Sequence, residues 1–570
     1  MVIQIFKLNR AILLFITCCF FEQVMSQNNG LLQKIDWQDN YRLMQLTDTA
    51  VNNSYLYHDR SFAIRPIDIF APNSKKHNWL ELNQFSYTTL QNDHLAMGYN
   101  NENFFQATGL QSRYSLGLKA QFGRLSISLQ PELVTAENKE QDDIDPSFSD
   151  ADFFSRYYYS HINVIDLPSR FGTKPIQKFF PGQSSIKYNF NKFAVGISTE
   201  NIWWGPGIYN SLVMTNNAPG FLHLTLNTLK PIATKVGSFE GQLVYGVLDS
   251  SGIDPVENVR QKRFWAGAYV PKVTTAKRNL VGYVVSWQPK WIKNLFIGFA
   301  SSYYFYDNVV TDDPNFMYPY SASSQSFDMA AMGSIFARYA MPKEHAEVYL
   351  EIGRADKPAN LFNLIGDTIP VGYTAGFRKL YKLNTLPGFI EIAAELTRLQ
   401  LSDPQLIFSE QNPYSIRKIR SWYTSGKIRQ GYTNYGQLLG AGIGPGSNSQ
   451  RLDISWVNGF NKFGIHGERV IHDNDFYYYE YLSQTIGYGW ENRYWVDLTY
   501  GIHTQLNWKK LTLAGLIDFS SALNYKWVKL DGEYDGPSSI SDKVNTRMSF
   551  SIKYKLEKKV RLKMPKLLKF

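Results

Sequence analysis

The side chains best suited to chemistry lie close together between residues 198 and 220. Two adjacent indoles, Trp203 and Trp204, precede a Gly-Pro-Gly turn at 205–207. An indole face can stack on the C–H face of a pyranose ring, and carboxamides can hydrogen-bond to sugar hydroxyls. The asparagines that could supply such bonds are Asn201, Asn210, Asn216 and Asn217. The segment is therefore a candidate carbohydrate-binding platform.

The same segment also has a purely structural interpretation. Residues 193–197 alternate as a strand, but Pro206 cannot donate a ladder hydrogen bond and glycines permit unusual backbone, so the ladder must break here. Adjacent tryptophans in a strand point to opposite faces, so one would pack or face lipid and the other would face inward. A bulge that places tryptophan at a membrane interface is the simpler of the two hypotheses, and both stay open.

Other polar motifs lack parts that catalysis or metal binding would need. Residues 444–447 are glycine-rich but lack the Lys-Ser/Thr pair of a phosphate loop. The His-x-Glu motifs at 345–347 and 466–468 lack the second histidine of a zinc helix, and the aspartates between 142 and 152 lack the register of a calcium loop. No serine nucleophile elbow is present. We therefore expect no enzyme activity, no cofactor and no metal site.

The elements that position these residues are predicted to be β-strands. Aromatic residues make up 15% of the chain and charged residues only 19%, whereas soluble proteins carry about 25% charge. Aromatic side chains favour strands. Apolar and polar residues alternate with a period of two in 114–122, 125–130, 496–508 and 548–556. Each such strand has one apolar face and one polar face that carries Lys, Gln, His or Asn.

Strands of this kind are compatible with a β-sandwich, a β-propeller or a membrane β-barrel with a water-filled interior. The sequence has no blade-length repeat, and its aromatic residues cluster near strand ends, which favours the barrel. We predict an all-β fold, a transmembrane antiparallel β-barrel of roughly 16–18 strands over residues 81–570. The expected interfacial aromatic residues are Trp287, Trp291, Trp490, Trp495, Tyr303, Tyr304 and Tyr306.

Residues 1–26 have the layout of a cleaved signal peptide. A basic start precedes an apolar stretch at 11–21, and cleavage is expected before Gln27. A lipoprotein anchored at Cys18 is the weaker alternative, because the residues before this cysteine fit a lipobox poorly. Both cysteines lie in this segment, so a mature chain would form no disulfide. Export to the cell outer membrane is the predicted localisation.

The segment 27–80 is predicted to be an N-terminal appendage that is partly helical, because residues 31–46 read as a short amphipathic helix. The chain carries a formal net charge of +10, and much of the excess lies in the tail 555–566. For an exported protein this indicates an anionic lipid surface or an anionic polymer, and not nucleic acid. Basic residues that could attract an acidic glycan, or simply face water, are Lys418, Arg420, Lys427 and Arg429.

The segment 198–220 resembles the Wzi-type capsule assembly proteins of Gram-negative outer membranes, in the form found in Bacteroidetes. The matching motifs are Ser-Thr-Glu-Asn-Ile-Trp-Trp-Gly-Pro-Gly at 198–207, Asn-Ser-Leu at 210–212, Asn-Asn-Ala-Pro-Gly at 216–220, and the further stretches 395–397, 430–434, 444–450 and 493–498. The resemblance implies an outer-membrane barrel with an N-terminal helical portion that acts as a surface lectin for capsular polysaccharide. It adds Tyr432 and Asn434 to the candidate ligand contacts.

Three hypotheses for function follow. The first is a non-enzymatic, lectin-like barrel that binds and anchors capsular or other surface polysaccharide during capsule assembly. The second is a porin-like sugar channel or transporter, and the third is an outer-membrane enzyme, for which the sequence offers no catalytic set. The expected partners of the first are the polysaccharide, outer-membrane lipid and the capsule export machinery, with the barrel itself a monomer.

Overall fold

A computed structural model describes residues 34–47, 78–141, 161–253, 276–307, 329–355, 370–401, 421–478, 494–527 and 542–561. Several positions singled out in the sequence lie outside these ranges, namely the signal peptide, the aspartates between 142 and 152, Lys418, Arg420 and Trp490. In the described ranges, no helix is long and apolar enough to cross a membrane.

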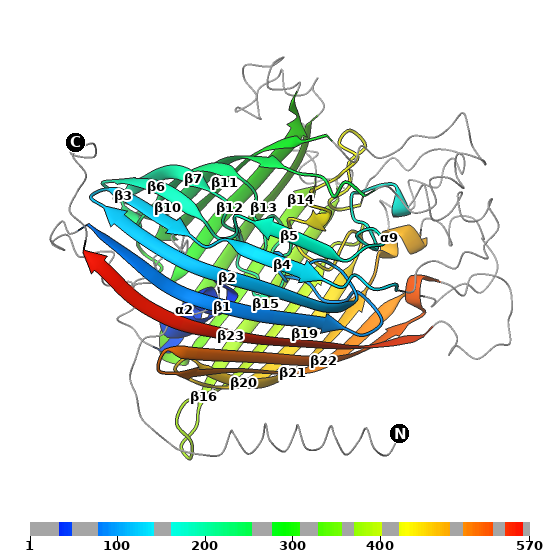
Figure 1. Cartoon of the computed structure of the whole chain (residues 1–570). Helices are drawn as coiled ribbons and strands as arrows, with labels where there is room; N and C mark the ends of the chain where they lie inside the picture. The colour runs from blue at the N-terminus through cyan, green and yellow to red at the C-terminus, as the bar shows by residue number, and fades with distance from the viewer. Residues whose placement is uncertain are drawn as a thin grey trace, which may run out of the picture.

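The described strands form a closed antiparallel barrel of eighteen strands (Figure 1). Strand β1 (Trp79–Asn92) pairs with β2 (Gly109–Phe122) on one side and with the last strand, β23 (Lys543–Arg561), on the other. In this register Thr88 lies opposite both Arg113 and Ser551. The predicted all-β barrel is therefore confirmed, with a strand number at the upper end of the expected range.

Three of the barrel strands are each built from two short pieces. The pairs of pieces are β3 (Leu125–Leu129) with β4 (Glu132–Ala136), β5 (Ile176–Phe180) with β6 (Ser185–Phe190), and β8 (His223–Thr228) with β9 (Ile232–Ala233). Besides β1, β2 and β23, the continuous strands are β7 (Phe193–Ser198), β10 (Gly237–Leu248), β11 (Arg278–Pro289), β12 (Leu295–Tyr306), β13 (Met329–Met341), β14 (Ala346–Ala355), β15 (Val371–Lys382), β16 (Phe389–Arg398), β19 (Asn448–Asn458), β20 (Asn461–Ile471), β21 (Val496–Trp508) and β22 (Leu511–Leu523). Other described elements are α2 (Lys34–Thr47), α9 (Asn474–Tyr477), the 3-10 turns η4 (Pro342–Glu344) and η6 (Tyr525–Trp527), and a small hairpin of β17 (Thr433–Asn434) and β18 (Gln437–Leu438).

The two faces of each strand differ as the alternation predicts. On β2, Tyr114 and Leu116 are exposed on the outside, whereas Ser115 and Lys119 are buried on the inside. On β23 the exposed residues include Met548, Phe550 and Tyr554, and the buried ones include Ser551, Lys553 and Lys555. A contiguous band of exposed apolar side chains around a barrel suits a hydrocarbon surround, because water would make it unfavourable.

The two ends of the barrel are different. At one end neighbouring strands join through tight turns, such as Gly123-Arg124 between β2 and β3 and Gly459-Phe460 between β19 and β20. Gly123 and Gly459 have φ values of 58° and 59°, a conformation that glycine adopts at least cost. At the other end the connections are long, such as residues 199–222 and 399–447. In bacterial outer-membrane barrels the short turns face the periplasm and the long loops face outward.

Only part of the expected aromatic girdle is found. Trp291 is 66% exposed at a tight turn and packs against Trp287 with ring centroids 5.7 Å apart, and Trp508, which was not among the expected residues, is 66% exposed at another tight turn. The prediction is wrong for all three tyrosines of β12, because Tyr303 is 3% exposed, Tyr304 is buried in the lumen core and Tyr306 donates a hydrogen bond to Gln430 Oε1. Strand alternation turns Tyr304 and Tyr306 inward, toward residues far away in sequence.

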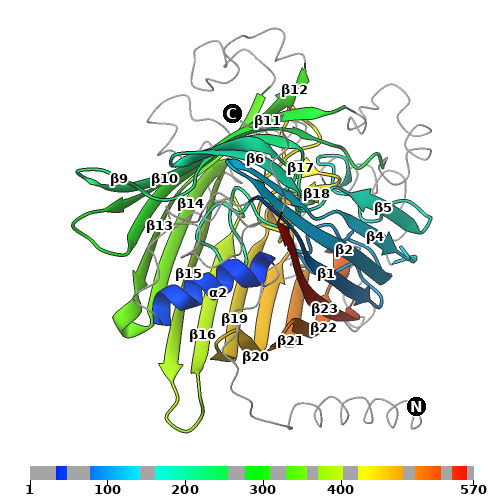
Figure 2. The same cartoon turned by 60° about the vertical axis from the view of Figure 1, so that its left-hand side comes forward.

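Helix α2 corresponds to the short N-terminal helix predicted at 31–46. It lies inside the barrel, near the tight-turn end, beside β15 and β16 (Figure 2). Leu43 and Leu46, three residues apart on one helical face, pack against Ala340, Leu380 and Val457 of the wall. The polar face of the helix meets charged wall residues. The helix is thus an inner filling of the barrel and not an outer appendage.

Candidate functional site in the barrel lumen

The Trp-Trp-Gly-Pro-Gly segment leaves the wall after β7 and folds back into the lumen. The backbone N–H of Trp204 donates to Met214 O at 3.1 Å, which closes the segment on itself. The Trp204 indole is 1% exposed, and its Nε1 donates to Gln242 Oε1 on β10 at 3.0 Å. A Cβ on Gly282 of β11 would lie 2.8 Å from this ring. The interfacial position considered for Trp204 is therefore wrong, because the ring packs on the inner wall.

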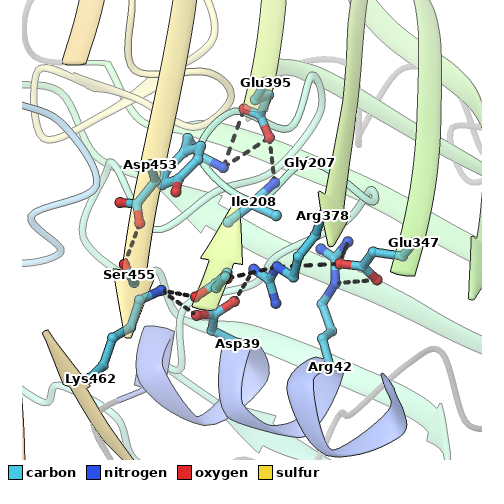
Figure 3. Close-up of polar contacts among 12 residues, drawn as sticks. Asp39, Arg42, Gly207, Ile208, Glu347, Arg378, Glu395, Asp453, Ser455 and Lys462 are labelled. Atoms are coloured by element: carbon cyan, nitrogen blue, oxygen red, sulfur yellow. Dashed lines mark hydrogen bonds and ion pairs between the residues drawn. The ribbon is translucent and has the colours of Figure 1, made fainter. Parts of the chain in front are cut away.

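One carboxylate from β16 fixes the turn that follows. Glu395 accepts three successive backbone N–H groups and one phenol, and Figure 3 shows this carboxylate beside Ile208. The donors are Ile208 at 2.6 Å, Tyr209 at 3.1 Å, Asn210 at 2.6 Å and Tyr349 Oη at 2.8 Å. Hydrogen bonds to an ionised acceptor are about twice as strong as neutral ones. Glu395 thus holds a turn that lies 187 residues away in sequence.

A second buried carboxylate continues this pattern on β14. Glu351 accepts from Ser211 Oγ at 3.0 Å, from the Leu212 backbone N–H at 3.2 Å and from Ser334 Oγ at 2.7 Å. Leu212 is completely buried. The two carboxylates therefore support neighbouring parts of one loop from neighbouring regions of the wall.

The second sequence signature, at 430–434, meets the first inside the lumen. Tyr423 donates its hydroxyl hydrogen to Leu212 O at 2.9 Å, and its ring is stacked on Tyr432 with centroids 6.1 Å apart. Asn434 Nδ2 donates to Pro219 O at 3.0 Å, and Asn217 Nδ2 donates to Leu438 O at 3.0 Å. These contacts join the loops 199–222 and 421–447 into one core, which also contains Trp204 and Tyr304.

Most of the predicted ligand contacts lie within this core. Seven of them are buried, namely Asn201, Trp204, Asn210, Asn216, Asn217, Tyr432 and Asn434, whereas Trp203 is half-buried. Asn201 Nδ2 donates to Ala218 O at 2.7 Å, and Trp203 Nε1 donates to Gly207 O at 3.2 Å. The described hydrogen bonds of these side chains support the loops. Their contact with a ligand stays a prediction.

A network of ion pairs docks helix α2 against the wall (Figure 3). Asp39 pairs with Arg378 of β15, and Lys462 Nζ of β20 lies 3.5 Å from Asp39 Oδ2. Arg378 Nε and Lys462 Nζ also lie 3.0 and 2.8 Å from the two carboxylate oxygens of Glu391 on β16. The helix charge Asp39 is thus enclosed by two cations, which in turn share a buried carboxylate.

A second ion-pair group connects the same helix to the Trp-Trp-Gly-Pro-Gly segment. Arg42 Nη2 lies 2.9 Å from Glu347 Oε1, and Arg42 Nη1 donates to Pro206 O at 2.7 Å. Glu347 also pairs with Arg338 Nη2 at 2.6 Å, and Arg338 Nη1 donates to Gln45 Oε1 at 2.8 Å. Helix α2 and the loop 199–222 therefore form one connected structure inside the barrel.

Sequence reasoning did not assign these charged residues to the site, although Glu347 and Glu395 lie in motifs that it singled out. Glu347, Glu351, Arg378, Glu391 and Glu395 all occupy inward positions of strands that the alternation pattern could have assigned. Charged residues inside such strands are the available signal, since buried charges need partners. The partners themselves are far away in sequence.

The basic residues expected near the glycan are only partly described. Lys427 is exposed, and Arg429 Nη2 donates to Asn163 O at 3.1 Å. Both lie in the 421–447 segment, which belongs to the long-loop end of the barrel. Their role in attracting an acidic polymer stays a prediction.

The charge of Asp39 gives the helix contact a defined pH dependence. Burial alone would raise the pKa of the Asp39 carboxyl, but Arg378 and Lys462 outweigh it and hold that pKa well below its ordinary value of 3.8. Ionised Asp39 therefore stabilises the docked helix above that ordinary value, and the stabilisation is lost as the pH falls through the lower pKa of the folded state. We expect the difference in unfolding temperature between wild type and Asp39→Asn to be constant near neutral pH and to shrink below about pH 4.

Thermal conversion of the unboiled barrel on detergent gels, measured at a series of pH values, tests this. The exposed Asp93→Asn serves as the control and should follow wild type throughout. A difference for Asp39→Asn that stays the same at acid pH would contradict the prediction.

These features define a class of protein, an outer-membrane β-barrel whose lumen holds its own loops and an N-terminal helix. The chain belongs to the capsule assembly protein Wzi family, whose sequence profile matches residues 93–509. This confirms the resemblance noted in the sequence and agrees with the outer-membrane location.

Structural comparison matched this chain to several solved structures. Wzi of Escherichia coli, described as an outer membrane protein involved in group 1 capsule assembly and a carbohydrate-binding β-barrel, is 10% identical, with a TM-score of 0.49, 82% of this chain covered and 84% of that chain. OccAB1 and OccAB2 of Acinetobacter baumannii are 9% and 11% identical, each with a TM-score of 0.40 and 84% of this chain covered, and with 97% and 98% of their own chains covered. Comparison with curated protein sequences found no match.

Proposed function

We propose that this protein binds capsular or other surface polysaccharide at the outer membrane and anchors it during capsule assembly, without cleaving it. Membership of the capsule assembly family supports the general role. The anchoring role rests on one observation, the apolar core that the loops 199–222 and 421–447 build inside the barrel. In this proposal the barrel acts as a monomer beside the capsule export machinery.

That core favours holding a polymer over conducting sugars. A sugar channel needs a continuous water-filled path through the barrel. Here the lumen contains large side chains that are almost completely buried against one another and the wall, namely Trp204, Leu212, Trp422, Tyr423 and Tyr432. Helix α2 adds a second obstruction nearer the tight-turn end. The full-length protein in planar bilayers should accordingly show no large, stable openings, and such openings would favour the porin-like alternative.

Anchoring is tested directly by binding and by deletion. The purified full-length protein should retain capsular polysaccharide of its own organism and should not shorten it. Cells without the gene should release capsule into the medium. Undiminished capsule on those cells, with none released, would contradict the proposal.

Among the candidate contacts, Trp203 is the one that retains partial exposure. If its ring stacks on a sugar, Trp203→Ala should weaken polysaccharide binding by about 2- to 10-fold, since aromatic contacts contribute about 0.5–1.5 kcal/mol beyond area burial. Biolayer interferometry with immobilised polysaccharide provides the measurement. Trp291→Ala, which removes an exposed ring at a tight turn, should bind as wild type does. Equal affinities for both variants would exclude Trp203 from the binding surface.

A further inference from the structure

Four neighbouring strands place two histidines and two aspartates side by side on the lumen face. They are Asp453 on β19, His466 on β20, His503 on β21 and Asp518 on β22. The His466-x-Glu motif lacks a second histidine within its own strand, but the adjacent strand supplies His503. The ladder therefore assembles a group that spacing along the chain does not reveal.

Glycines on the two central strands make room for the imidazole rings. His466 lies opposite Gly501, and His503 lies opposite Gly464. A Cβ on Gly501 would lie 2.7 Å from His466 Nε2, and a Cβ on Gly464 would lie 2.7 Å from His503 Nε2. Contacts this short are not tolerated, so each ring can lie across the neighbouring strand only because that position is glycine.

Three of these side chains are close enough to share one ion, and Asp518 lies beside them. His503 Nε2 lies 3.6 Å from Asp453 Oδ2, and His466 Nε2 lies 3.2 Å from Asp518 Oδ1. One ligand atom each from Asp453, His466 and His503 can be chosen so that all three lie within 4.8 Å of one another. Sharing an ion would therefore require only small side-chain movements.

The burial of His466 is an independent indication that this cluster binds a ligand. The His466 side chain is 1% exposed, and its Nδ1 has no hydrogen-bond partner among the residues that the structure describes. A buried polar atom without a partner costs about 1–3 kcal/mol. The His503 side chain is 20% exposed, which leaves access to the cluster from the lumen.

We propose that Asp453, His466 and His503 form a binding site for a divalent transition metal ion, with Zn²⁺ the best match. Imidazole and carboxylate are ordinary zinc ligands, with bonds of about 2.0–2.2 Å. Asp518 orients the His466 ring, as carboxylates beside ligating histidines commonly do. Arg547 Nη1 lies 3.4 Å from Asp518 Oδ2 and offsets its charge, which suits Asp518 to this supporting role. A bound ion would tie β19, β20 and β21 together at the lumen face.

Zinc titration of the purified full-length protein, after chelator treatment and in detergent, tests the site. Isothermal titration calorimetry should show that the protein binds Zn²⁺, and the unfolding temperature should rise when Zn²⁺ is added. Co²⁺ in place of Zn²⁺ should give the visible absorption of a tetrahedral site. His466→Gln and His503→Gln should each weaken Zn²⁺ binding by at least roughly 10- to 100-fold. His94→Gln, which removes an exposed histidine, should leave this binding unchanged.

Two results would overturn the proposal. One is the absence of Zn²⁺ binding by the wild-type protein, which would leave the cluster as two His–Asp ion pairs. The other is equal binding by wild type and by the histidine variants, which would assign the ion to another place. Each variant is compared only when its unboiled form migrates as a folded barrel, and Asp453→Asn provides a third ligand variant should a histidine variant fail to fold.

Discussion

Replacing Glu395 with alanine is expected to destabilise the folded protein by about 2–4 kcal/mol and to free the loop 199–222 from the wall. The substitution removes the acceptor for four donors, the N–H groups of Ile208, Tyr209 and Asn210 and the hydroxyl of Tyr349. Each buried donor that loses its acceptor costs about 1–3 kcal/mol, and water entering the space left by the side chain recovers part of the sum. Glu395→Gln should fall between alanine and wild type, because its carboxamide keeps one acceptor oxygen.

The temperature at which the unboiled gel band converts to the unfolded one measures this loss. Limited proteolysis should also cut within 199–222 faster in Glu395→Ala than in wild type. The matched control is Glu344→Ala, which removes an exposed glutamate at a tight turn. Unchanged conversion temperature and unchanged proteolysis in Glu395→Ala would mean that the turn does not depend on this carboxylate.

Replacing Arg378 with alanine is expected to undock helix α2. Arg378 is buried and pairs with Asp39 on the helix, while Glu391 and Glu347 lie 3.0 and 3.7 Å from its Nε. Removing one partner of a buried ion pair costs about 3–5 kcal/mol, because the remaining charges lose their compensation. Adding Glu391→Gln to Arg378→Met should restore much of the stability, since it removes one carboxylate together with the cation and leaves Asp39 paired with Lys462.

A single introduced cysteine reports the undocking. Both native cysteines precede residue 20, so Leu46→Cys in a chain cleaved before Gln27 would carry the single thiol, at a position with 0% exposure. In the Arg378→Ala background its maleimide labelling should speed up by more than about 10-fold, which corresponds to only about 1.4 kcal/mol. Lys382→Ala, at an exposed lysine of the same strand, should leave the labelling slow. Slow labelling in both backgrounds would show that other contacts hold the helix.

The barrel itself could be predicted from the sequence, because lipid requires apolar side chains at every second position of a membrane-spanning strand. In 114–122 and 548–556 each residue is assigned to a face by its own type, and the structure agrees for most of them, although Ala120 is buried. The rule fails in 303–306, where three tyrosines and a phenylalanine follow one another. Aromatic residues suit both the membrane interface and a packed lumen, so composition could not show that Tyr304 and Tyr306 turn inward.

The lumen site was only partly accessible to such reasoning. The motifs around Trp204 and Tyr432 were recognised, and the structure brings them together. Their positions were not predictable, since Glu395 and Glu351 fix the first loop from strands that lie more than a hundred residues away. The His466–His503 cluster was missed for the same reason, because a ladder and not a motif brings its members together.

The pairing of β1 with β23 has a consequence for how the protein is made. The seam joins the first strand to the last, so the cylinder cannot seal until the end of the chain has been synthesised. The loops 199–222 and 421–447 hold each other across more than two hundred residues of sequence, and a sealed wall would leave little room for them to find each other. Folding of the interior must therefore accompany or precede sealing.

A nascent chain that lacks β23 would expose two strand edges with unpaired backbone groups, which hydrocarbon does not tolerate. We therefore expect membrane insertion and completion of the interior to be coupled.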